Sequence, residues 1–115
     1  RREQMDKLSA YRQIVQKALS KHAELAPSHG QIESVPVFDE RNDHYLLVDF
    51  GWEQTGRVYS VVVHTRLKDG KIWIERDGTE EGMAEEFVRA GVPREDIVLA
   101  FYRPERRRIT EFAVD

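Results

Sequence analysis

Residues 64–75 read His-Thr-Arg-Leu-Lys-Asp-Gly-Lys-Ile-Trp-Ile-Glu, and this stretch holds the best-defined local element of the chain. Asp69 and Gly70 stand between two runs in which apolar and polar residues alternate. Such a dipeptide is typical of a two-residue type I′ turn, because both of its positions need a positive φ. The stretch therefore predicts a β-hairpin. Its expected pairs are Leu67 with Ile72, Arg66 with Trp73, Thr65 with Ile74 and His64 with Glu75.

The two sides of this hairpin differ in polarity. One side is apolar, whereas the other places Arg66 near Trp73 and His64 near Glu75, pairs suited to cation–π and charge-assisted contacts. Trp73 needs a further surface to cover it, because large exposed aromatic side chains mark interfaces. The N-terminal helix, a second subunit and a partner protein are the candidates for that surface. We expect a homo-oligomer or a partner-bound subunit, with an interface that includes Arg66, Trp73, His64 and Glu75.

Upstream of the hairpin the sequence predicts three strands. The first spans residues 32–38, where Pro36 indicates an edge or a bulge because proline lacks a backbone N–H. The second spans residues 44–52, and the third, residues 57–67, leads into the turn. One face of the second strand is wholly apolar, formed by Leu46, Val48, Phe50 and Trp52. We therefore expect Trp52 to lie in the core.

An amphipathic helix is predicted before these strands, over residues 6–26. Apolar residues recur there at helical spacing, and polar ones fill the other side. His22 falls on the apolar side, where a hydrogen-bonded core histidine is a better interpretation than a metal ligand. Residues 27–30, Pro-Ser-His-Gly, are expected to stop the helix. Residues 1–4 precede Met5, a candidate initiator, and we expect them to be a disordered or artificial extension.

Downstream of the hairpin a second helix is predicted over residues 80–90. Asp77 or Thr79 can cap its N-terminus, and Gly91 suits the left-handed position after its end. Two more strands follow, over residues 97–101 and 109–114, with a turn at 104–108 between them. The order α-β-β-β-β-α-β-β predicts an α+β fold with an antiparallel-dominated sheet. The 115 residues form a single domain, because two pieces would each be too small to bury a core.

Composition narrows the class of protein. The chain is 40% hydrophobic and 34% charged, so it is neither disordered nor embedded in a membrane. It has no cysteine, which excludes disulfides and thiolate chemistry, and we expect a cytoplasmic protein. The net charge of −3 argues against a dedicated nucleic-acid binder, which normally carries a basic surface. Four arginines do cluster near the C-terminus as candidates for nucleic-acid contact: Arg103, Arg106, Arg107 and Arg108.

No residues stand out as catalytic, metal-binding or cofactor-binding. The four histidines, at positions 22, 29, 44 and 64, lie apart in the sequence, and the glycines form no phosphate-binding motif. Asp49, Glu75 and Asp77 could hold Mg²⁺ as in a nuclease, but such sites generally add a nearby lysine. Pairing of Glu75 with His64 and helix capping by Asp77 explain two of these residues without chemistry. We expect a protein that is not an enzyme and that needs no cofactor.

Several longer motifs resemble the XisI family. They are FGW at residues 50–52, KIWIERDGTE at 71–80 and GVPREDIVLAF at 91–101, with MDKL at 5–8 and TEFAV at 110–114. The resemblance extends from Met5 onward and implies an accessory protein found mainly in cyanobacteria, the fdxN element excision controlling factor. It further implies action with a XisH-like partner beside a site-specific recombinase that removes a DNA element. Direct DNA binding and, behind it, metal-dependent nuclease activity are the alternatives.

Overall fold

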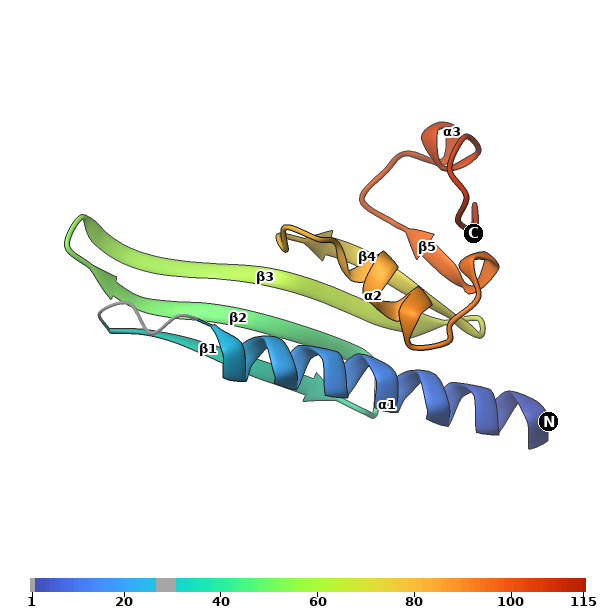
Figure 1. Cartoon of the computed structure of the whole chain (residues 1–115), viewed down its shortest axis with the longest axis horizontal. Helices are drawn as coiled ribbons and strands as arrows, with labels where there is room; N and C mark the ends of the chain where they lie inside the picture. The colour runs from blue at the N-terminus through green and yellow to red at the C-terminus, as the bar shows by residue number, and fades with distance from the viewer. Residues whose placement is uncertain (1, 27–30) are drawn as a thin grey trace.

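The computed structural model describes residues 2–26 and 31–115, with side chains from Asp6 onward, so the expected helix stop at 27–30 lies outside the described residues. Helix α1 (Arg2–Leu25) precedes four strands, and shorter elements follow them (Figure 1). The strands are β1 (Gln31–Asp39), β2 (His44–Glu53), β3 (Gly56–Lys68) and β4 (Lys71–Asp77). The later elements are α2 (Met83–Arg89), the 3₁₀ turn η1 (Arg94–Asp96), β5 (Ile97–Leu99) and α3 (Pro104–Arg107).

The strands form one sheet in the order β1-β2-β3-β4-β5. Neighbours are antiparallel except β4 and β5, which are parallel and are joined through α2 and η1. The predicted α+β fold with an antiparallel-dominated sheet is confirmed. No helix among residues 2–26 and 31–115 is long and apolar enough to cross a membrane.

The predicted hairpin is confirmed at its turn. Asp69 and Gly70 have φ angles of 54° and 76°, and Leu67 pairs with Ile72 as expected. Further from the turn a bulge between His64 and Thr65 shifts the register, so that His64 lies opposite Arg76. The expected pairing of His64 with Glu75 is therefore wrong. A bulge adds a residue to one strand, and no signal near the turn encodes it.

Replacing Gly70 with valine tests the conformation of this turn. A Cβ at Gly70 would meet no atom within 4 Å, so the cost comes only from its φ of 76°. Because a β-branched residue is strained there, we expect Gly70→Val to lower the free energy of unfolding by on the order of 1 kcal/mol. Chemical denaturation measures this loss, and an unchanged midpoint would contradict the strain.

Helix α1 packs on the face of the sheet that carries Tyr45 and Leu47. Its residues Tyr11, Val15 and Leu19 are buried in the same core cluster as these two β2 residues. Tyr45 is fully buried, and its hydroxyl donates to Asp43 and accepts from Arg12. Burial, above all, together with the bond to Asp43 raises the pKa of Tyr45 to about 12.

Helix α1 begins at Arg2, within residues 1–4, the segment expected to be an extension.

The core therefore uses the other face of β2 from the one predicted. Trp52 is 55% exposed, which corrects the expectation that it lies in the core. Both faces of β2 are apolar enough to be buried, and the hydrogen bonds on Tyr45 make its burial favourable. Alternation within β2 cannot choose between two such faces, because the choice depends on where α1 packs.

The C-terminal part differs from the prediction in four places. Strand β5 ends at Leu99 rather than at residue 101, and the turn expected at 104–108 contains helix α3. Helix α2 starts at Met83 rather than at residue 80, although Asp77 accepts the Met83 N–H at 2.7 Å and so caps it as expected. Residues 109–114 form no strand, since only Ala113 makes a bridge, to Val98. The reason is local, because the Thr110 hydroxyl accepts the Phe112 N–H and donates to the Arg107 carbonyl. These bonds compete with strand pairing.

Candidate functional site

The predicted interface residue Trp73 is covered by its own chain. It is 8% exposed, and its indole N–H donates to the Lys68 carbonyl at 3.1 Å. Three cations lie over its ring, at centroid distances of 5.5 Å for Arg66, 4.7 Å for Lys68 and 5.7 Å for Arg107. Arg107 belongs to α3, so the C-terminal segment supplies part of this cover. Trp73 itself offers little surface to another protein.

The other predicted interface residues make two polar pairs. Arg66 Nε lies 2.8 Å from a carboxylate oxygen of Glu75, so the two form an ion pair across the hairpin. His64 Nε2 lies 2.9 Å from His44 Nδ1, an arrangement in which one ring donates and the other accepts. The histidine pair comes from two strands, β2 and β3, and sequence spacing could not reveal it. An interface at Arg66, Trp73, His64 and Glu75 stays a prediction.

The histidine pair gives a pH dependence with a definite sign. Burial, followed by the charges of His44 and Arg66, lowers the pKa of His64 from 6.5, while Glu75 opposes the shift. The neutral ring is then favoured in the folded state. The contribution of His64 to the free energy of unfolding is therefore fully present above pH 6.5 and is lost as the pH falls below that value. We expect urea denaturation to show lower stability at about pH 5 than at pH 7.5, and His64→Gln to reduce the difference. An identical pH dependence in the variant would contradict this role.

A broad apolar surface lies on the sheet face opposite α1, which we call the open face. Its side chains come from β1, β2 and β3 and alternate with buried residues such as Tyr45 and Leu47. Val37, Trp52 and Tyr59 are 46%, 55% and 73% exposed. The members of the open face are Val35, Val37, Leu46, Val48, Phe50, Trp52, Tyr59 and Val61. The strands also extend well beyond the C-terminal end of α1 (Figure 1).

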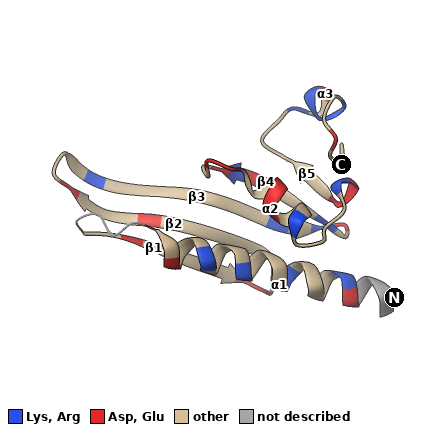
Figure 2. Cartoon of the chain, viewed as in Figure 1, with Lys and Arg blue, Asp and Glu red and all other residues tan. Residues whose placement is uncertain are grey.

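The sequence contained the signal for this surface. The alternation of Leu46, Val48, Phe50 and Trp52 marks an apolar face, which the sequence predicts to be core and the structure leaves open at Trp52. The colours of Figure 2 show most of β2 and β3 without charged residues. Exposed apolar residues in such a group mark sites of interaction with proteins.

The arginine cluster is divided between internal and exposed roles. The Arg107 guanidinium donates to the carbonyls of Leu99, Ala100, Tyr102 and Val114 at 2.9–3.2 Å. Arg106 lies 4.5 Å from the centroid of the Tyr102 ring. Arg103 and Arg108 are exposed. Arg107 is thus occupied within the C-terminal segment.

The three carboxylates weighed for a metal site take part in separate contacts. Asp49 accepts a hydrogen bond from Ser34 at 2.6 Å, and Glu75 pairs with Arg66. Asp77 accepts from Thr79 and Met83 at the start of α2. Within the described part of the chain, no three His, Asp or Glu side chains are grouped so that they could hold a metal ion.

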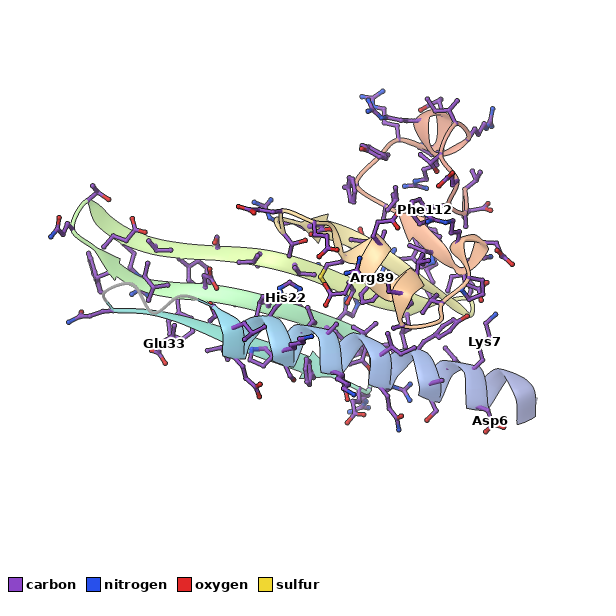
Figure 3. The ribbon with its side chains drawn as sticks, in the orientation of Figure 1. Asp6, Lys7, His22, Glu33, Arg89 and Phe112 are labelled. Atoms are coloured by element: carbon purple, nitrogen blue, oxygen red, sulfur yellow. The ribbon has the colours of Figure 1, made fainter. Side chains whose placement is uncertain are left out.

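His22 connects the two larger helices. Its Nε2 lies 2.7 Å from a carboxylate oxygen of Glu86 on α2, and its side chain is 33% exposed. Figure 3 shows His22 on the side of α1 that faces α2. The hydrogen bond agrees with the interpretation of His22, but a side chain that is 33% exposed is not a core residue, so that part of the expectation is wrong.

Comparison with known proteins gives consistent matches over almost the whole chain. The family model described as XisI protein matches residues 5–114. A XisI-like protein from Anabaena variabilis ATCC 29413, solved at 1.30 Å, is 38% identical with a TM-score of 0.89, over 94% of this chain and 99% of that one. The fdxN element excision controlling factor XisI from the same strain, solved at 2.19 Å, is 35% identical with a TM-score of 0.81, over 95% and 99%. No curated protein matches.

Proposed function

This chain belongs to the XisI family, and from that premise we propose that it is a non-enzymatic controlling factor in the site-specific excision of a DNA element. It acts with a XisH-like partner and, through that partner, on a site-specific recombinase. The observation that carries the proposal is the similarity to the fdxN element excision controlling factor XisI, which covers 95% of this chain. A cytoplasmic location is part of the proposal.

Surface features suited to protein contacts, rather than to catalysis, support this role best. Asp49, Glu75 and Asp77 are each engaged in separate structural contacts, which leaves them poorly placed for shared metal binding. By contrast, several large apolar side chains are exposed, including Trp52 and Tyr59. Exposed aromatic residues are typical of protein interfaces.

Direct DNA binding is the second candidate, favoured by the exposed Arg103 and Arg108. The net charge of −3 and the internal use of Arg107 oppose it. We therefore expect the purified chain to bind duplex DNA only weakly at physiological salt. Tight, sequence-selective retardation in a mobility-shift assay, lost in Arg103→Glu with Arg108→Glu, would favour this second function instead.

An excision reporter tests the proposed function. Cells carry the element between its recombination sites, together with the recombinase and the XisH-like protein from the same genome. We expect excision to fall when this chain is omitted and to return when it is supplied. The purified chain should also be retained on the immobilised XisH-like protein. Unchanged excision without the chain would contradict the proposal.

A further inference from the structure

We propose that the open face is a homodimer interface whose occupant is a second copy of this chain. This inference goes beyond the proposed function and does not rest on it. Tyr59 and Trp52 are 73% and 55% exposed on a continuous three-stranded surface. Leaving such side chains in water is unfavourable, and a sheet with one bare apolar face is stabilised when a second sheet packs on it.

The pattern of charge on the open face favours a second copy over a different protein. Along β2, the side chains that project from this face between Leu46 and Trp52 are all apolar, so this strand can meet its own copy without burying a charge. Two charges lie on the flanking strands near the turn that joins β2 to β3. Glu33 of β1 is opposite Phe50, and Arg57 of β3 is opposite Trp52. At this end the face thus carries one charge of each sign, on opposite sides of its apolar centre, whereas Arg66, opposite His44 at the other end of the same face, is paired with Glu75.

A twofold axis along β2 makes this arrangement self-complementary. Such an axis places β1 of one copy over β3 of the other, because it exchanges the two sides of β2. Glu33 then lies near Arg57 of the second copy, and the symmetry repeats this contact. The strands of the two sheets remain roughly aligned, as in a β-sandwich. Figure 3 shows Glu33 near the end of the sheet that extends beyond α1.

The size of the face is sufficient for a dimer of moderate affinity. From the spacing of residues and strands, the three strands present an area of roughly 500 Å² per copy. A specific interface buries about 1,000 Å² in total at the lower end, which two such faces reach. We therefore expect a dimer with a Kd in roughly the micromolar range.

Light scattering on the full chain tests the dimer. At about 50 µM the wild type should have twice the 13.5 kDa mass of the chain. Trp52→Lys with Tyr59→Lys should raise the Kd at least ~30-fold and give a monomer, since loss of one aromatic hot spot typically has this effect. Both side chains are exposed in the monomer, so circular dichroism should show an intact fold. Ile109→Lys, at an apolar residue that is 83% exposed on the C-terminal segment, is the matched control and should remain dimeric.

Three outcomes would overturn the proposal. They are a monomeric wild type at this concentration, a dimer that persists in the double lysine variant, and a wild type that is monomeric alone but binds the XisH-like protein through Trp52.

Exchanging the charges of Glu33 and Arg57 tests the twofold axis separately. Glu33→Arg and Arg57→Glu should each weaken the dimer a few-fold, and together they should restore it. Failure of the double exchange to restore the dimer would contradict a twofold axis along β2.

Discussion

Replacing Arg107 with alanine is expected to destabilise the protein by about 3 kcal/mol and to expose Trp73. The guanidinium donates to four backbone carbonyls, contributed by Leu99, Ala100, Tyr102 and Val114, and it lies over the Trp73 ring. Alanine would remove a donor from each of these partly buried carbonyls, of which the Leu99 carbonyl keeps the Tyr102 N–H. Thermal melting should therefore shift downward by roughly 10 °C, with a red shift of tryptophan fluorescence.

Two variants test whether the geometry of the Arg107 side chain, rather than its charge, carries this structural role. Arg107→Lys keeps the charge, but an ammonium group lacks the planar set of donors, so most of the loss should remain. Arg108→Ala removes an exposed arginine next in the sequence and should change stability by no more than about 0.5 kcal/mol. Full stability of Arg107→Lys would show that charge, rather than geometry, holds the C-terminal segment.

Replacing Gly51 with alanine should cost about 3 kcal/mol or more. A Cβ at this position would lie 1.9 Å from the Gln31 carbonyl oxygen and 2.8 Å from the Ile32 Cα, both of them backbone atoms of β1. The φ of Gly51 is 147°, which adds strain for any other residue. The end of β1 would have to separate from β2. Urea denaturation measures the loss, and hydrogen exchange should be fastest at the start of β1.

Gly56→Ala is the matched control for this prediction. Gly56 has a similar φ of 140°, but a Cβ there would meet no atom within 4 Å. Its substitution should therefore cost only the backbone strain, about 1 kcal/mol. Equal losses in the two variants would mean that φ alone, and not the close approach of β1, makes Gly51 necessary.

Features that depend on neighbouring residues could be predicted from the sequence. Asp69 and Gly70 determine the turn because only a few residue types adopt a positive φ, and the turn sets the pairing of Leu67 with Ile72. Asp77 could be identified as a helix cap because its acceptor lies only six residues before Met83. The motifs that resemble the XisI family were also present in the sequence itself, and the family is confirmed.

The tertiary structure alone decided the candidate surfaces. The sequence predicted that β2 alternates and that its face with Trp52 lies in the core, but the packing of α1 on Tyr45 and Leu47 left Trp52 exposed. The tertiary structure likewise brought His44 to His64, and it brought Arg107 to backbone carbonyls between residues 99 and 114. Local backbone preferences act over a few residues and are encoded there. Burial and long-range hydrogen bonds depend on which surfaces meet, and that is fixed only when the whole chain packs together.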